Sequence, residues 1–194
     1  MLNNKIKMHC LAALTGAMCV AAGSTHAEGL GWVVLGGLDM GGDTLYTALF
    51  NNGTTKKINA GEFLHIDGGV VFKTAPGNPA WESQLTIGYK VDNIVAQNGS
   101  VTFSRYPLDM LEFYNEGQWR LGAGLTYHLS PTLTGDGVAS GLNVTFDNAL
   151  GFLAEADYKM GKAYVGGRVT LIDYKVYGIT VNGNSLGGVF GYRF

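Results

Sequence analysis

The stretch Trp119–Leu129 reads WRLGAGLTYHL, and its side chains alternate between two kinds. One set is apolar or aromatic and comprises Trp119, Leu121, Ala123, Leu125, Tyr127 and Leu129. The residues between them are polar or very small: Arg120, Gly122, Gly124, Thr126 and His128. Successive side chains of a β-strand point to opposite faces of the sheet. The stretch therefore predicts a strand with one apolar face and one polar or glycine-lined face.

The same alternation recurs along the chain between turn signals and predicts an all-β fold. We expect eight strands, at about Trp32–Met40, Phe63–Lys73, Gln84–Asp92, Val101–Tyr114, Trp119–Leu129, Phe146–Tyr158, Lys162–Tyr174 and Leu186–Phe194. The first alternates weakly, because Val33, Val34 and Leu35 are consecutive. The fourth contains Pro107, which cannot donate a ladder hydrogen bond and predicts a bulge or a local break.

The composition indicates where the apolar residues must lie. Of the 194 residues 14% are charged, 46% are hydrophobic and 30 are glycine, and the net charge is -2. A soluble domain typically has about 25% charged residues. Beyond residue 27 no apolar run approaches the roughly 20 residues of a spanning helix, so the apolar surplus is spread over the strands. The weak negative charge does not favour nucleic-acid binding.

The first 27 residues have the pattern of a secretory signal peptide. Lys5 and Lys7 precede an apolar segment at 9–22, and Thr25-His26-Ala27 offers a cleavage site. We expect cleavage after Ala27 and one domain at 28–194, with a retained membrane anchor as the alternative. Cleavage would remove both cysteines, which excludes disulfides, thiol catalysis and cysteine-ligated zinc from the remaining chain.

The predicted connectors differ in length at the two ends of the strands. Tight turns are expected at 115–118 and 159–162, and longer polar loops at 41–62, 93–100, 130–145 and 175–185. Short turns on one side and longer loops on the other are typical of a transmembrane β-barrel. The link 74–83, which contains Pro76 and Pro79, is expected on the short side and is long for it. The pattern favours an eight-stranded antiparallel up-and-down transmembrane barrel over a soluble lipocalin-like barrel with its apolar faces inside.

The first long loop has two alternating pieces of its own. Residues 44–50 and 54–58 flank Asn51-Asn52-Gly53, a hairpin turn signal. We interpret them as a hairpin that projects beyond the membrane. The alternative counts them as barrel strands and gives ten strands.

The end of the chain, Phe190-Gly-Tyr-Arg-Phe194, resembles the C-terminal signature of bacterial outer-membrane β-barrels. With the signal peptide and the strand count, the chain resembles the small eight-stranded barrels of the OmpA/OmpX/OmpW type. The resemblance implies the bacterial outer membrane as location, contact with its lipid and lipopolysaccharide, and assembly by the outer-membrane insertion machinery. It implies Phe190, Tyr192 and Phe194 as the assembly signal. It implies no cofactor and leaves any extracellular partner open.

The charged residues fall on the polar strand faces, which face inward in such a barrel. These are Asp39, Asp67, Lys73, Lys90, Asp92, Arg105, Asp109, Arg120, Glu155, Asp157, Arg168 and Arg193. Six cations and six anions predict an ion-pair network that fills the barrel interior, the lumen, with Arg120 paired to Glu155. We take Lys73, Arg105, Asp109, Arg120, Glu155, Asp157, Arg168 and Arg193 as this network. The alternative is a narrow porin-like channel for small solutes.

A second polar group is expected near the extracellular mouth of the lumen. It comprises Asp39, His65, Asp67, Lys90, Asp92 and His128. Carboxylates and imidazoles can bind a divalent cation or respond to pH. The favoured interpretation is that these side chains satisfy one another, so no metal is expected.

His128-Leu129-Ser130 resembles the His-x-Ser element of the outer-membrane lipid A deacylases, in which a glutamate is the third member. The nearest downstream glutamate in this chain, Glu155, is expected near the opposite end of the next strand. Those enzymes act on the lipid-facing wall. His128 instead shares the inward face of its strand with Arg120. We therefore expect a structural or surface-interaction role without enzymatic activity, and keep acyl hydrolysis as an alternative.

Overall fold

The computed structural model describes residues 29–194 except 51 and 76–77. The expected signal peptide lies outside the described residues. The described residues contain no helix long and apolar enough to cross a membrane.

Eight strands form a closed ring. They are β1 (Gly31–Met40), β4 (Phe63–Ala75), β5 (Asn78–Ala96), β6 (Gly99–Glu116), β7 (Trp119–Gly137), β9 (Ala149–Met160), β10 (Ala163–Val176) and β12 (Ser185–Arg193). Each pairs antiparallel with the next, and β1 pairs with both β4 and β12, which closes the barrel. The predicted eight-stranded antiparallel up-and-down fold is confirmed.

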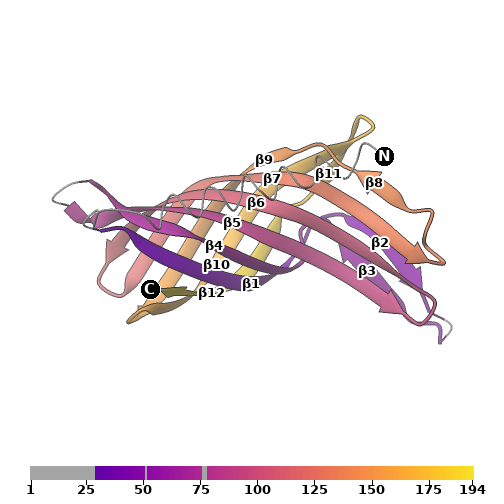
Figure 1. The fold of residues 1–194 in the computed structure, drawn as a ribbon, viewed down its shortest axis with the longest axis horizontal. Coiled ribbons are helices and arrows are strands. Elements are labelled where there is room, and N and C mark those ends of the chain that lie inside the picture. Colours follow the sequence, from indigo (N-terminus) through magenta and orange to yellow (C-terminus); the bar gives the residue numbers. More distant parts are fainter. Residues whose placement is uncertain (1–28, 51, 76–77) are drawn as a thin grey trace, which may run out of the picture. The chain divides into compact units, whose positions relative to one another are not determined.

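Four shorter strands lie outside the ring. They are β2 (Thr44–Leu49), β3 (Thr55–Asn59), β8 (Asn143–Thr145) and β11 (Ile179–Asn182). β2 and β3 pair only with each other as the hairpin of the first loop, so the ten-strand alternative is wrong. β8 pairs with the end of β7, and β11 with the end of β10. All four lie toward one end of the barrel, here called the loop end; the chain terminus Phe194 lies at the other, the turn end (Figure 1).

Three connectors are shorter than the sequence suggested. β4 ends at Ala75 and β5 begins at Asn78, so the link expected at 74–83 is mostly strand. β5 also runs to Ala96 and β6 starts at Gly99, so the loop expected at 93–100 is a tight turn. The predicted loop 130–145 is largely the continuation of β7 to Gly137. β5 and β6 remain paired as far as Ala96 and Gly99, and Ile94 and Val101 in this extension are buried.

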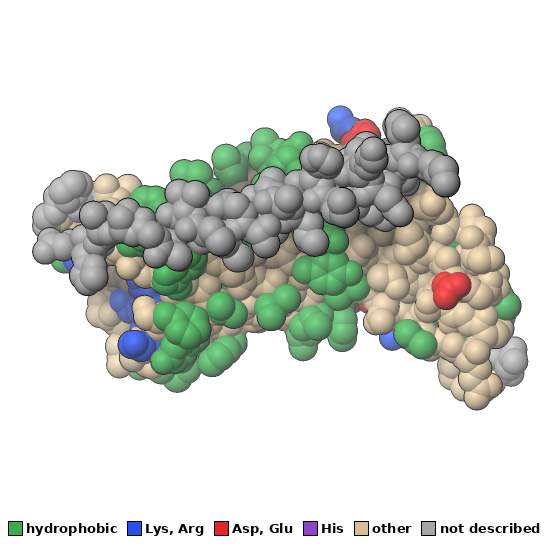
Figure 2. Space-filling view, in the orientation of Figure 1, with side chains coloured by type: hydrophobic (Ala, Val, Ile, Leu, Met, Phe, Trp, Pro, Cys, Tyr) green, Lys and Arg blue, Asp and Glu red, His purple; other side chains and the backbone are tan. Residues whose placement is uncertain are grey.

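The two faces of the barrel wall differ sharply in chemistry. On β7, the exposed side chains are Trp119, Leu121, Leu125 and Tyr127, whereas Arg120, Thr126 and His128 are buried inside. On β1, where the alternation in the sequence is weak, apolar side chains also lie on the outer face, with Trp32 and Val34 exposed. Figure 2 shows hydrophobic side chains around the part of the barrel wall nearer the turn end. The lipocalin-like arrangement, with these apolar faces inside, is therefore wrong.

The break predicted at Pro107 is accompanied by a bulge on the neighbouring strand. Ser104 faces Thr132 and Tyr106 faces Leu129, so Ser130 and Pro131 together lie opposite the single residue Arg105. Ser130 takes a left-handed conformation with a φ of 49°. On the other side of β6, the ladder with β5 is interrupted between Ile87–Leu108 and Lys90–Arg105, where Pro107 has no N–H to donate. The fourth strand is thus locally broken, and the bulge lies on β7.

Glycines of one strand make room for the inward side chains of the next. A Cβ at Gly88 would overlap the Asp67 carboxylate, and a Cβ at Gly187 would overlap that of Asp39. A Cβ at Gly37 would lie 2.5 Å from Nε2 of His65. The lumen of an eight-stranded barrel is only wide enough for side chains to fill. The glycines therefore allow large polar groups to lie inside it.

We predict that Gly88→Ala destabilises the barrel, because the added methyl displaces the buried Asp67 carboxylate. Overpacking of this kind costs about 1–3 kcal/mol. The midpoint of urea unfolding of the refolded barrel measures the loss. Gly68→Ala on β4 is the matched control, because a Cβ there meets nothing within 4 Å. Equal midpoints for the two variants would contradict the close packing described here.

Candidate functional site in the barrel lumen

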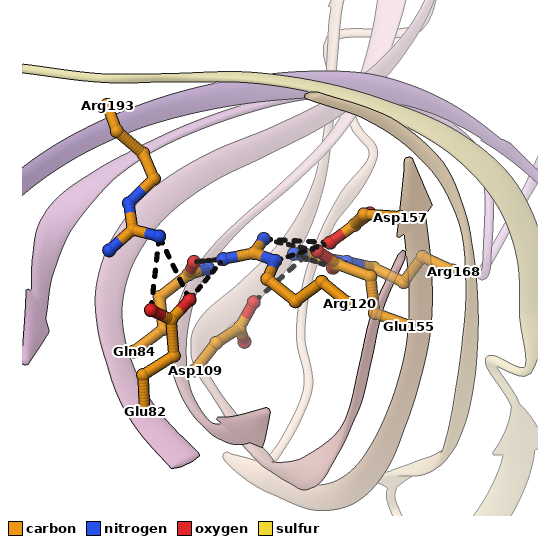
Figure 3. A network of polar contacts seen from close by, with 8 residues as sticks. All are labelled: Glu82, Gln84, Asp109, Arg120, Glu155, Asp157, Arg168 and Arg193. Atoms are coloured by element: carbon orange, nitrogen blue, oxygen red, sulfur yellow. Dashed lines mark hydrogen bonds and ion pairs between the residues drawn. The ribbon is translucent and has the colours of Figure 1, made fainter. Parts of the chain in front are cut away.

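Arg120 lies at the centre of the lumen and is completely buried. Its Nε donates to Asp157 Oδ2 at 2.8 Å, its Nη1 to Gln84 Oε1 at 3.0 Å and its Nη2 to Glu155 Oε1 at 3.4 Å (Figure 3). The guanidinium carbon lies 3.8 Å from the ring centroid of Phe113 and 4.1 Å from that of Tyr164. A residue of β7 thus contacts β5, β6, β9 and β10. One guanidinium bridges most of the cross-section of the barrel.

Arg168 of β10 forms the next layer of ion pairs. Its Nε donates to Glu155 Oε2 at 2.7 Å, and its Nη1 donates to Asp109 Oδ2 at 3.1 Å. The other Asp109 oxygen accepts the Thr126 hydroxyl at 2.6 Å. Glu155 therefore joins Arg120 to Arg168 through its two oxygens, and the charges form one connected network.

Arg193 and Glu82 complete the network toward the turn end. Nη1 of Arg193 donates to both oxygens of Glu82 at 3.1 Å, and the same carboxylate lies 3.5 Å from Nη1 of Arg120. The side chain of Arg193 is 30% exposed, so this pair lies near the open rim. Sequence reasoning missed Glu82 because it placed the residue in a connector. Glu82 has the same parity as Gln84, so extending the alternation by two residues would have found it.

The structure brings most of the predicted network residues into contact, but Lys73 and Arg105 lie outside the network. The expected contact of Arg120 with Glu155 is present, but the residue directly opposite Arg120 on β9 is Asp157, and Glu155 lies opposite Arg168. Lys73 is exposed and forms no ion pair among the described residues, because β4 reaches the rim there. Arg105 lies apart from the network, nearer the loop end.

The polar group that was expected near the extracellular mouth divides into two groups. In the first, Asp39 Oδ2 pairs with Lys90 Nζ at 2.6 Å, Asp67 Oδ2 contacts His65 Nδ1 at 2.6 Å, and His65 Nε2 lies 3.9 Å from Asp39. The second group contains His128, whose Nδ1 contacts the Tyr174 hydroxyl at 2.6 Å, and Asp92, which accepts the backbone N–H of Asn59.

A small cavity lies between these groups and the Arg168 pairs. Its volume is about 10 Å³, and its lining includes Asp39, His65, His128 and Arg168. That is room for about one water molecule. Within the described part of the chain, no group of three or more His, Cys, Asp or Glu side chains could hold a metal ion.

An apolar cluster lies above the polar layers, at the loop end. Ile58 and Ala60 of the first loop pack with side chains from five barrel strands or their ends: Ile94, Val101, Phe103, Leu133, Phe146, Ala149, Ile172 and Tyr174. The rings of Phe103 and Phe146 meet edge-on at 5.5 Å. Buried Arg105 lies under Phe103 at 4.6 Å and donates to the Glu62 carbonyl at 2.6 Å. We call this set the mouth cluster. The base of the first loop therefore packs into the mouth of the barrel. The sequence predicted a projecting hairpin in this loop but not the packing of its base.

His128, Ser130 and Glu155 do not come together as a catalytic group. His128 is buried and contacts Tyr174, whereas Ser130 lies in the exposed bulge, where its backbone N–H donates to Asn148. Glu155 is held by Arg120 and Arg168. No hydrogen bond joins the three side chains in the described structure.

Comparison with known proteins found no matching family model and no matching curated protein. Among solved structures, one match is to Ail, the attachment invasion locus protein of Yersinia pestis, in complex with the heparin analogue sucrose octasulfate. The TM-score is 0.47 at 9% sequence identity, over 85% of this chain and 97% of that chain.

We predict that Arg120→Met lowers the stability of the refolded barrel strongly, because it leaves Asp157 buried without a cation, whereas Glu82 keeps Arg193 and Glu155 keeps Arg168. Breaking a buried pair on one side costs about 3–5 kcal/mol. Adding Asp157→Asn removes this uncompensated charge and should recover part of the loss. The urea midpoints of the wild type, the two single variants and the double variant measure both effects.

Lys73→Met is the control, because this lysine is exposed at the rim, where removing a charge changes stability by less than about 1 kcal/mol. If Arg120→Met behaved like Lys73→Met, or if the Arg120 and Asp157 effects simply added, the network would not carry the stability assigned to it.

Proposed function

We propose that the chain is an integral β-barrel of the bacterial outer membrane, with a closed lumen and a structural or surface-interaction role at its loop end. The observation that carries the proposal is the combination of an apolar outer wall with a lumen filled by paired charges. A closed barrel satisfies its backbone hydrogen bonds internally, which is the condition for crossing a bilayer. A soluble protein of this size would expose a much smaller apolar surface.

The aromatic side chains of the outer wall support a membrane position. Pairs of aromatic rings lie on the outer wall near the turn end: Trp81 with Tyr114 at 5.2 Å, and Trp119 with Tyr158 at 5.3 Å. Toward the loop end, Tyr89 pairs with Tyr106 at 5.4 Å. Two aromatic belts around an apolar band are typical of membrane barrels, whose belts lie at the two lipid–water interfaces.

The chain terminus fits assembly by the outer-membrane insertion machinery. Phe190, Tyr192 and Phe194 all point outward, and the Phe194 N–H donates to the Trp32 carbonyl at 3.0 Å. The terminal residue therefore lies at the seam where β12 meets β1. We propose these three residues as the signal for insertion, and lipid with lipopolysaccharide as the surroundings of the wall.

The filled lumen favours a surface role over the porin-like channel. Arg105 and Arg120 are fully buried, and the mouth cluster lies above them. Acyl hydrolysis has no assembled serine–histidine pair to support it. The loop end, which carries β2, β3, β8 and β11, is then the part of the protein left to meet other molecules.

We predict that the loop end faces outside the cell. In a chain whose Cys10 and Cys19 are replaced by serine, Asn52→Cys and Asp136→Cys should react with an impermeant maleimide on intact cells. Gly117→Cys, in a tight turn at the other end, should react only after the cells are broken. The opposite pattern would overturn the topology, and no labelling of any site before lysis would overturn the outer-membrane location.

A further inference from the structure

A groove of about 760 Å³ lies at the loop end. One wall is β2 and the residues after it, including Tyr46, Ala48 and Phe50. The opposite wall is the tip where β5 turns into β6, and Val138 and Ala139 close the third side. Ligand sites of proteins have volumes of about 300–1,000 Å³.

The floor of the groove belongs to the mouth cluster. Ile94 and Val101 line the groove and are almost completely buried. They pack there with Phe103 and Tyr174, above the layers of ion pairs. A molecule that enters the groove therefore meets a closed floor, so the groove suits binding rather than transit.

The lining combines two kinds of uncharged side chain. Tyr46, Phe50, Val95 and Val138 offer apolar and aromatic surface, whereas hydroxyl and amide groups come from Ser100, Asn52, Gln97 and Asn98. None of the 15 lining residues is charged. Three charged neighbours of the groove already have hydrogen-bond partners. Lys56 Nζ donates to the Asn93 carbonyl at 3.1 Å, Asp92 accepts from Asn59, and Asp136, which lies opposite Ser100, accepts the Gly137 N–H at 2.7 Å. Figure 2 shows this end covered mostly by uncharged polar side chains and backbone.

This uncharged lining favours an uncharged ligand. A charged group would lose its hydration in the groove without gaining an opposite charge. A purely apolar ligand would cover the amides and leave them without hydrogen-bond partners, which costs free energy. A neutral sugar has C–H faces that pack on aromatic rings and hydroxyl groups that bond to amides.

We propose that this groove binds a neutral oligosaccharide from outside the cell. The inference rests on the proposed function, because the groove must lie at the cell surface. Tyr46 and Phe50 supply the stacking surface, and Gln97 with Asn98 supplies hydrogen bonds at the rim.

The test is calorimetric titration of the refolded full-length barrel with neutral oligosaccharides: maltohexaose, cellohexaose and triacetylchitotriose. Sulfated maltohexaose is the charged counterpart. We expect at least one neutral sugar to bind, and Tyr46→Ala and Gln97→Ala each to weaken that binding about tenfold, or about 1.4 kcal/mol. Gln97 is exposed in a turn, so its variant keeps the fold even if Tyr46→Ala does not. Tyr177→Ala, an exposed tyrosine in the β10–β11 turn outside the groove, is the matched control and should bind as wild type.

Three results would overturn the proposal: no binding of any of the three neutral sugars, tighter binding of the sulfated sugar, or an equal loss in Tyr177→Ala. Surface labelling of Asn52→Cys on intact cells separates this failure from that of the proposed function. A barrel that labels at the surface but binds no sugar would retain its membrane location and lose only the ligand.

Discussion

The burial of Arg120 is the constraint on which the rest of the structure depends. A guanidinium cannot lose its proton in a protein and must be paired where water is excluded. Asp157, Glu155 and Gln84 bond to it from both sides of the barrel, and Phe113 and Tyr164 cover its faces. Because these partners come from four other strands, the pairing fixes their relative register as well as filling the lumen. The ring of strands and its polar contents therefore depend on each other.

The outer wall and the lumen make opposite demands on the same strands. Alternate residues must be apolar on the outer wall and polar in the interior, and the interior also needs glycines where a neighbouring side chain crosses the strand. Gly88 beneath Asp67 and Gly187 beneath Asp39 show how the two demands are met. At the loop end the polar layers give way to the mouth cluster, which closes that end of the lumen. Any recognition would then depend on the loops.

The period of two in the sequence was enough to predict the strands, the barrel and the inward charges, because parity alone decides which face a side chain takes. Parity could not choose between Asp157 and Glu155 as partners of Arg120, since both lie on the inward face and register decides. Lys73 had the correct parity, but its place at the rim leaves it exposed. The mouth cluster was missed because Ile58, Phe103 and Phe146 meet only after the chain folds, and no local pattern links them.

The central claim is that the lumen is closed, and the accessibility of Thr126 tests it most directly. This completely buried residue lies in the Arg168 layer, where its hydroxyl donates to Asp109. Thr126→Cys, in a chain with Cys10 and Cys19 replaced by serine, should resist a small methanethiosulfonate reagent while the barrel is folded and react once it is unfolded. Val95→Cys, at an exposed loop-end position, should react in both states. Reaction of the Thr126→Cys thiol in the folded barrel at the rate seen for Val95→Cys would contradict a closed lumen and indicate a water-filled path.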